Sequence, residues 1–252
     1  MITHPNFKIN LGLYIVSKRS DGFHELQTVF YPVDTLKDEL EINRIDKGVQ
    51  LSVFRVDNLC ATEDNLCVKA FRLLQKLFDI DGVEIKLTKN IPFGAGLGGG
   101  SADAAFALRM YNELFQLQLS TNELQNLAAQ LGSDTAFFIE NRPVYATGRG
   151  EIMTPINMDL SDYKIEVIKP DFSISTKEAY AGVHPQQPEI SLNDLIQKPI
   201  SEWKHCIRND FEDTLFVKYP QLQEIKDDFY ARGAVYASMS GSGSAVYGIF
   251  KI

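Results

Sequence analysis

Polar and apolar residues alternate near the start of the chain, and this period of two predicts a β-strand. The apolar positions would share one face of that strand: Phe7, Ile9, Leu11, Leu13 and Ile15. Lys8 and Asn10 would then project side by side from the opposite face. We therefore treat Lys8 as a candidate functional residue, although a solvated strand lysine remains the alternative.

The rest of the first half alternates between strand and helix patterns. Strands are predicted over four further segments: 23–31, 39–45, 49–54 and 82–89. The segments 39–45 and 49–54 are expected to belong to an antiparallel group. Apolar residues at helical spacing predict a helix over 64–78. A second helix is expected after Ser101 as its N-cap. Ser120 and Glu123 form a capping box for a third helix, which would end by Gly132.

The short polar segment 155–162 divides the chain, and we place the domain boundary between residues 157 and 158. The domains are therefore 1–157 and 158–252. The second is predicted as a small α+β sandwich of antiparallel strands and helices. Its strands are expected over 163–168, 234–239 and 245–250, and its helices near Thr176, around Leu192 and over 221–231.

Composition places the chain among ordinary globular proteins. It has 252 residues, is 44% hydrophobic and 23% charged, and carries a formal net charge of −8. A length of this order allows one large or two modest domains. The acidic balance argues against a basic face that neutralises many phosphates of duplex nucleic acid. We therefore expect no nucleic-acid partner.

The chain also lacks the signals of export and membrane insertion. No segment approaches the roughly 18–20 apolar residues of a spanning helix, and the N-terminus lacks a signal-peptide pattern. The cysteines, three in number and without a CxxC pair, fit reduced thiols. The four histidines have no metal-ligand spacing, so no metal site built by the protein is expected. We expect a cytoplasmic protein without a membrane partner.

The densest local signal is a glycine-rich run between a predicted strand and a predicted helix. Five of the seven residues from Gly94 to Gly100 are glycine, which lets backbone N–H groups converge on an anion. A Walker A loop would carry a lysine directly before Ser101, and Gly100 stands there instead. A Rossmann fold would follow with a second strand, whereas 113–123 gives helix and cap signals. The run therefore predicts a phosphate loop of another kind.

Residues 92–102, PFGAGLGGGSA, resemble the phosphate loop of the GHMP kinases, the family of galactokinase, homoserine kinase, mevalonate kinase and phosphomevalonate kinase. Lys8–Leu11 and Ser240–Ser244 match the same family in the expected order. The resemblance assigns these residues to ATP: Asn65 near the adenine, and Pro92, Phe93, Gly94, Ala95, Gly96, Leu97, Gly98, Gly99, Gly100, Ser101 and Ala102 in the loop. Asn65 would equally serve as a helix N-cap.

The segment Arg19–Thr28, RSDGFHELQT, is similar to one branch of this family, and 131–134 and 146–151 resemble the same branch. That branch uses ATP to phosphorylate the 2-hydroxyl of a cytidine-diphosphate-linked methylerythritol in the non-mevalonate isoprenoid pathway. The resemblance implies an α+β fold of two lobes, one like ribosomal protein S5 domain 2 and one ferredoxin-like. ATP and substrate would meet in the cleft between the lobes.

The resemblance also implies a catalytic pair, Lys8 and Asp134. An alcohol is a poor nucleophile, so a carboxylate must accept or orient its proton while a cation balances the charge on the transferring group. A nearby lysine also keeps such a carboxylate ionised. A helix cap is the alternative role for Asp134, and both roles can hold together. Mg²⁺ is expected to arrive with ATP, within reach of Ser101.

Substrate recognition falls by the same resemblance on Asn10, Phe23, His24, Thr176 and Tyr180. In the family an aromatic pair sandwiches the cytosine ring, and the histidine reads its polar edge. The first aromatic is commonly Tyr and the second commonly Phe, whereas here they are Phe23 and Tyr180. The alternative is that both are core aromatics.

Two other functions stay open at this point. One is a GHMP-fold kinase of another small alcohol, such as a mevalonate-like compound or a sugar. The other is a GHMP-like binding protein without catalysis. The expected partners are ATP and the cytidine-diphosphate-linked alcohol, and the expected state is a monomer or weak homodimer.

Overall fold

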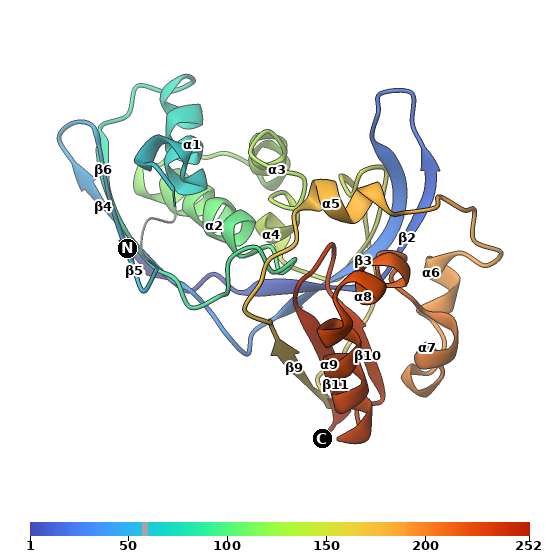
Figure 1. Cartoon of the computed structure of the whole chain (residues 1–252). Coiled ribbons are helices and arrows are strands. Elements are labelled where there is room, and N and C mark those ends of the chain that lie inside the picture. The colour runs from blue at the N-terminus through green and yellow to red at the C-terminus, as the bar shows by residue number, and fades with distance from the viewer. Residues whose placement is uncertain (57–59) are drawn as a thin grey trace. The chain divides into compact units, whose positions relative to one another are not determined.

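The computed structural model describes residues 1–56 and 60–252 (Figure 1). The chain forms two compact units that interleave in sequence. Unit 1 comprises Met1–Phe7, Leu36–Phe93 and Gly98–Arg142, and unit 2 comprises Lys8–Thr35, Gly94–Leu97 and Pro143–Ile252. The glycine-rich run is thus divided between the units. The boundary between residues 157 and 158 stays a prediction.

Unit 1 is built on a four-stranded sheet in the order β1-β4-β6-β5. Its strands are β1 (Ile2–Thr3), β4 (Glu39–Ile45), β5 (Val49–Phe54) and β6 (Gly82–Thr88). The pairing of β4 with β6 is antiparallel, but β5 pairs with β6 in parallel, so the prediction of an antiparallel group over 39–45 and 49–54 is wrong for β5. A helical crossover between β5 and β6 makes the parallel pairing possible.

The helices of unit 1 lie around α2, the helix that follows the glycine-rich run. They are η1 (Thr62–Asp64), α1 (Leu66–Gln75), α2 (Gly99–Leu114), α3 (Thr121–Ala129) and α4 (Phe137–Glu140). The first and second α-helices pack through the rings of Phe71 and Tyr111, whose centroids are 5.4 Å apart. The predicted capping box of Ser120 and Glu123 is confirmed at α3.

Unit 2 contains two sheets. The first has the order β2-β3-β7-β8, with β2 (Phe7–Lys18), β3 (His24–Val33), β7 (Val144–Thr147) and β8 (Ile152–Pro155). The predicted N-terminal strand is confirmed, and every residue from Phe7 to Ile15 is buried, so both faces of β2 are covered. The polar face that carries Lys8 and Asn10 is therefore not a surface open to solvent.

The second sheet of unit 2 is antiparallel in the order β10-β11-β9, with β9 (Tyr163–Ile168), β10 (Tyr236–Met239) and β11 (Val246–Lys251). Five helices accompany it in the described residues: α5 (Thr176–Ala181), α6 (Leu192–Leu195), α7 (Ile200–Cys206), α8 (Glu212–Lys218) and α9 (Pro220–Ala231). The last of these packs on β10 and β11. The sequence had not predicted α7 and α8.

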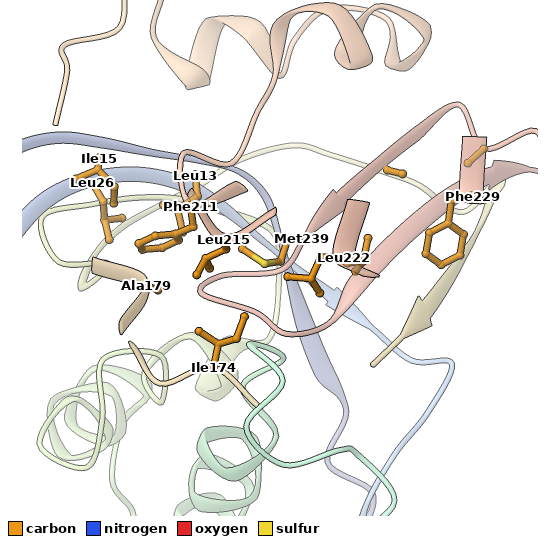
Figure 2. Close-up of a cluster of buried hydrophobic side chains, with 13 residues drawn as sticks. Leu13, Ile15, Leu26, Ile174, Ala179, Phe211, Leu215, Leu222, Phe229 and Met239 are labelled. Carbon is orange, nitrogen blue, oxygen red and sulfur yellow. The ribbon is translucent and has the colours of Figure 1, made fainter. Parts of the chain in front are cut away.

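A cluster of thirteen buried residues joins the elements of unit 2 (Figure 2). Leu13 of β2, Phe211 just before α8 and Met239 of β10 belong to it. This cluster fixes the strand that bears Lys8 to the strand that leads into the serine- and glycine-rich turn Ser240–Ser244. Among the described residues, no helix is long and apolar enough to cross a bilayer.

Candidate active site

The Lys8 ammonium group is buried in unit 2, where its side chain is held from two sides. Lys8 is 3% exposed, and its Nζ donates hydrogen bonds to Asn10 Oδ1 at 2.6 Å and to the carbonyl oxygen of Gly96 at 3.1 Å. The face of the Phe30 ring lies 5.0 Å from Nζ. The predicted proximity of Lys8 and Asn10 is confirmed.

Asn10 is fixed at each of its polar groups. Its Nδ2 donates to Thr28 Oγ1 at 2.9 Å, and its backbone oxygen accepts from the Tyr247 hydroxyl at 2.7 Å. Its backbone N–H donates to Ser240 Oγ at 3.3 Å. An ammonium group can only donate, so Asn10 must turn its Oδ1 toward Lys8. Asn10 therefore acts in this structure as an orienting partner of the lysine.

The first part of the phosphate loop packs against the Ser240–Ser244 turn in the same unit. Ser240 Oγ donates to the Gly96 carbonyl at 2.9 Å, and Ala245 N–H donates to the Ala95 carbonyl at 3.1 Å. A Cβ atom on Gly96 would lie 2.0 Å from the Ser240 carbonyl oxygen, so only glycine fits there. The resemblance named the loop and the turn separately, and the structure joins them.

The second part of the loop opens helix α2 in unit 1. Gly98 is the N-cap with φ +71°, and Ala102 N–H donates to the Gly98 carbonyl at 2.9 Å. The prediction that Ser101 is the N-cap is wrong, because Ser101 lies inside the first turn. The left-handed conformation of Gly98 allows the helix to begin at Gly99. The N–H groups of this first turn have no acceptor within the helix and suit an anion.

Asp134 lies in unit 1, on a turn that packs near that helix start. A Cβ atom on Gly132 would lie 3.1 Å from Thr135 Oγ1 and 3.8 Å from Ser101 Oγ. The turn is closed by a hydrogen bond from Thr135 N–H to the Gly132 carbonyl at 3.1 Å. Asp134 is half-buried on this turn, shortly before α4. Lys8 and Asp134 belong to different units, and their pairing stays a prediction.

A cavity of about 260 Å³ in unit 1 lies beside the helix start. It is lined mainly by apolar atoms, and its walls include Asn65, Leu66, Lys89, Phe93, Gly100 and Asp103. Three residues predicted to contact ATP therefore meet at one cavity. Asn65 also caps α1, since its Oδ1 accepts from Cys67 N–H at 2.9 Å. The capping role is thus confirmed, and the ATP role stays a prediction.

The sequence did not reveal a buried ion cluster beside this cavity. Lys89, 5% exposed, forms ion pairs with Asp38 and with Asp103, the latter at 2.6 Å from Nζ to Oδ2. Asp38 Oδ1 also accepts from Ile91 N–H at 2.8 Å, which anchors the chain just before the phosphate loop. Burial raises the pKa of Asp103 to about 7, against the opposing effect of Lys89. The sequence signal that could have suggested it is the position of Lys89 shortly before the loop.

The residues predicted to hold the cytosine ring lie in unit 2, in an arrangement that differs from a simple pair. Tyr180 stacks on His24, with ring centroids 4.9 Å apart and planes at 19°. Phe23 is 53% exposed, and the Arg149 guanidinium lies 4.8 Å from its ring centroid. Thr176 is exposed at the start of α5, one turn before Tyr180. The exposure of Phe23 excludes a core role for that ring.

Tyr180 is tied to the core from its other side. It meets Phe211 edge to face, with centroids 5.0 Å apart. Burial, and to a smaller extent the charge of Lys18, lowers the pKa of His24, so this imidazole is neutral at pH 7. A neutral imidazole offers one donor and one acceptor, which suits the edge of an uncharged base.

Comparisons with known proteins agree across the whole chain. The family model for the GHMP kinases N terminal domain matches residues 65–142, and that for the GHMP kinases C terminal domain matches residues 192–251. A 4-diphosphocytidyl-2-C-methyl-D-erythritol kinase of Bacteroides thetaiotaomicron is 54% identical over 100% of this chain and 92% of its own length. This chain belongs to that family of kinases.

Other relatives support the same assignment. The kinase of the same name from Cytophaga hutchinsonii is 44% identical over 100% of this chain and 93% of its own length. A crystal structure of 4-(cytidine 5'-diphospho)-2C-methyl-D-erythritol kinase matches with a TM-score of 0.86 and 32% identity, covering 99% of this chain and 90% of that one. A mevalonate kinase structure with a TM-score of 0.72 and 15% identity shows the shared fold. The predicted GHMP kinase fold is confirmed, and the protein is a kinase.

Proposed function

We propose that this kinase transfers the γ-phosphoryl group of ATP to the 2-hydroxyl group of 4-diphosphocytidyl-2-C-methyl-D-erythritol, a step of the non-mevalonate isoprenoid pathway. The substrate follows the name shared by its relatives. One observation carries the proposal: the buried Lys8 ammonium donates to the Gly96 carbonyl at 3.1 Å and so belongs to the phosphate loop. A cation at that position suits a transferring phosphoryl group.

The proposed step uses Asp134 and Lys8 in complementary roles. Asp134 accepts the proton of the 2-hydroxyl as its oxygen forms a bond to the γ-phosphorus. The bond from the γ-phosphorus to the bridging oxygen breaks, and ADP leaves with that electron pair. Lys8 offsets the negative charge on the transferring group, and Asn10 and Gly96 hold its ammonium in place. The products are ADP and the 2-phosphorylated alcohol.

ATP binding is assigned to the glycine-rich run and the neighbouring cavity. The first-turn N–H groups of α2 receive the phosphates. The cavity lined by Asn65, Phe93 and Gly100 receives the adenine, whose flat ring suits apolar walls. Mg²⁺ is a hard cation that prefers oxygen ligands and keeps phosphates and waters around it. The Ser101 hydroxyl in the first turn of α2 is the oxygen that fits its phosphate-bound form.

Cytosine recognition is assigned to Phe23, His24 and Tyr180, with Thr176 one helical turn away. Aromatic rings stack on a base from any face, and each stack contributes about 1–3 kcal/mol. Because Tyr180 now stacks on His24, a base held by Phe23 and Tyr180 requires His24 to turn toward the edge of the base. Such a movement would bring its neutral imidazole to the polar groups of cytosine.

The cellular setting is proposed on the same basis. ATP and a nucleotide-linked alcohol are cytoplasmic metabolites, and the three cysteines are free. We place the kinase in the cytoplasm as a monomer or weak homodimer, without nucleic-acid or membrane partners. Size-exclusion chromatography with light scattering checks the oligomeric state.

A substrate panel tests the proposed function. ADP release is measured with the cytidine-linked alcohol, with methylerythritol phosphate that lacks cytidine, and with mevalonate and galactose. We expect turnover with the first compound and at least about 100-fold lower kcat/KM with the others, because they forfeit both aromatic stacks. Turnover of mevalonate or a sugar instead would indicate a kinase of another alcohol, and ATP binding without turnover would indicate a binding protein.

Asp134→Asn is the matched variant for this panel. We expect ATP affinity to stay near the wild-type value while kcat falls by about 100-fold, the scale of a lost general base. Asp159→Asn, a change at an aspartate in the segment before β9, is the control and should leave kcat unchanged. Equal kcat for Asp134→Asn and wild type would refute the assignment of Asp134 as the base.

A further inference from the structure

Asn209, between α7 and α8 in unit 2, is a buried amide with no role in the reaction described above. It is 1% exposed. Its Nδ2 donates to the carbonyl oxygens of Met239 at 2.9 Å and Gly241 at 2.8 Å, and its Oδ1 accepts from Phe211 N–H at 3.0 Å. Both of its Nδ2 protons and its oxygen are therefore engaged.

The two carbonyls that Asn209 holds lie on either side of Ser240. Ser240 Oγ donates to the Gly96 carbonyl at 2.9 Å, and it accepts from Asn10 N–H at 3.3 Å. The Gly96 carbonyl is also an acceptor for Lys8 Nζ. A displacement of Ser240 would therefore move both groups that orient the Lys8 ammonium. Asn209 does not contact Lys8 through these bonds but holds the backbone on both sides of Ser240.

The backbone around Asn209 is fixed to the strand that carries Lys8. Leu13 N–H donates to the Arg208 carbonyl at 2.9 Å, and Asp210 N–H donates to the Leu13 carbonyl at 2.8 Å. The Asp210 carboxylate accepts from Ile15 N–H at 2.8 Å. Leu13 of this strand, Phe211 and Met239 share one buried cluster (Figure 2). The amide is thus anchored on β2 and reaches to the turn that touches Asn10.

Glu212 supports the same turn from its other end. Its carboxylate accepts from Met239 N–H at 2.7 Å and from Ser238 Oγ at 2.8 Å. Lys226 forms an ion pair with this carboxylate. Met239 is therefore held at its N–H by Glu212 and at its carbonyl by Asn209. The start of the turn has little freedom while both contacts are intact.

We propose that Asn209 is a positioning residue for phosphoryl transfer, which sets Ser240 against Gly96 and Asn10 and through them orients the Lys8 ammonium. This inference rests on the proposed function, because phosphoryl transfer is the step that Asn209 would affect. Positioning matters because a displacement of about 1 Å in a reacting group costs as much as 100-fold in rate. Asn209 is linked to Tyr180 through Phe211, whose N–H donates to Asn209 Oδ1 and whose ring meets Tyr180 edge to face. We expect cytosine binding to respond to the loss of this amide less than phosphoryl transfer does.

Steady-state kinetics of Asn209→Ala test the proposal, with Asn112→Ala as the matched control. Asn112 makes two hydrogen bonds to Leu119 in unit 1, so its loss should lower the melting temperature without touching the Ser240 turn. We expect kcat of Asn209→Ala, per folded molecule, to fall about 10- to 100-fold. The KM for the cytidine-linked alcohol should change less than about twofold. Asn112→Ala should keep the wild-type kcat.

Asn209→Ser serves as a second variant, since it keeps a hydroxyl in the buried site but is one bond too short to replace the Nδ2 donor. We expect its kcat to lie between those of wild type and Asn209→Ala. Should Asn209→Ala not fold, the same comparison is made with Asn209→Ser at a temperature where circular dichroism shows it folded. Wild-type kcat in the folded serine variant would then overturn the proposal.

A double-mutant cycle with Ser240→Ala tests the route. If Asn209 acts through Ser240, the double variant should have a kcat within about twofold of the slower single variant. Multiplicative losses, or wild-type kcat in Asn209→Ala, would overturn the inference. A wild-type protein without turnover of the alcohol would contradict the proposed function instead. The same cycle would then be measured on the slow hydrolysis of ATP by water, where Lys8 faces the same phosphoryl group.

Discussion

Among the described residues, two lysine side chains are buried beside the phosphate loop, one in each unit, and the groups that they bond differ. Lys8 in unit 2 is held by the Asn10 amide, the Gly96 carbonyl and the face of the Phe30 ring. These three contacts fix the position of the ammonium beside the Gly96 carbonyl of the phosphate loop. The role proposed for this ammonium is to offset negative charge on a transferring phosphoryl group.

Lys89 in unit 1 is held by two carboxylates instead, those of Asp38 and Asp103. Burial alone would lower the pKa of Lys89, but Asp103 and Asp38 outweigh it and raise that pKa. The Asp38 and Asp103 carboxylates neutralise the charge of Lys89. Asp38 also accepts from Ile91 N–H and so holds the chain just before the loop. The comparison teaches that burial alone does not identify a catalytic lysine. Lys8 differs from Lys89 in that its ammonium donates to a carbonyl of the phosphate loop itself, whereas Lys89 pairs with carboxylates outside the loop.

The largest expected effect is the loss of stability in Lys89→Met. The change leaves two buried carboxylates without their cation, which costs about 3–5 kcal/mol in the free energy of unfolding. Urea denaturation measures this loss. Lys86→Met, in the strand β6 that ends just before Lys89 but at a surface ion pair, is the control and should cost less than about 1 kcal/mol. If Lys89→Met and Lys86→Met were equally stable, Lys89 would not have the structural role that distinguishes it from Lys8.

Lys8→Met should affect catalysis more than stability. We expect kcat to fall by about 100- to 1,000-fold, the scale of a lost group that stabilises charge in the transition state. The loss of unfolding free energy should be smaller than in Lys89→Met, because that change leaves two buried carboxylates without their cation. Stopped assays of ADP formation and urea melts measure both quantities. A destabilised Lys8→Met with normal kcat would show that both lysines are structural.

The aromatic residues lie outside both lysine clusters and should respond in a third way. Phe23→Ala and Tyr180→Ala should each raise KM for the cytidine-linked alcohol about 10- to 100-fold, or 1–3 kcal/mol, with KM for ATP unchanged. Phe23→Ala should keep its melting temperature because the ring is 53% exposed, whereas Tyr180→Ala also loses a contact with Phe211. Loss of stability with unchanged KM would remove the cytosine assignment.

A further expected effect is a change in the pH dependence of stability. The pKa of Asp103 is about 7 in the folded chain, above its value of about 3.9 when unfolded. Between pH 4 and 7 the folded state binds the extra proton, so this group makes stability fall as pH rises. Asp103→Asn should remove that part of the slope. Urea melts of both proteins at pH 5 and pH 7.5 should therefore show a steeper loss for wild type.

The sequence predicted the parts of the site that depend on local pattern. Alternation in the first strand placed Lys8 beside Asn10, and the hydrogen bond between them confirms it. The glycine pattern predicted a loop that precedes a helix, and α2 follows. The helix begins earlier than expected because Gly98 takes the left-handed conformation, which a side-chain capping rule does not anticipate.

The parts that the sequence did not predict depend on pairing between distant segments. Asp38 and Lys89 are 51 positions apart, and no local period links them. β5 pairs with β6 in parallel because a helical crossover connects the two strands. The alternation of polar and apolar residues predicts a strand but not the direction in which it pairs. Asn209 reaches residues 30 and 32 positions away and stands in an irregular segment without helix or strand periodicity. Tertiary packing decides all three.

The identity of the product tests the central claim most directly. Wild-type protein is incubated with ATP, Mg²⁺ and 4-diphosphocytidyl-2-C-methyl-D-erythritol, and the product is examined by phosphorus NMR with proton coupling. We expect one new phosphomonoester, formed in equal amount to ADP, whose phosphorus shows no coupling to a proton on the ester carbon because the 2-hydroxyl is tertiary. A phosphomonoester coupled to such a proton, or ADP release without a new ester, would contradict the account.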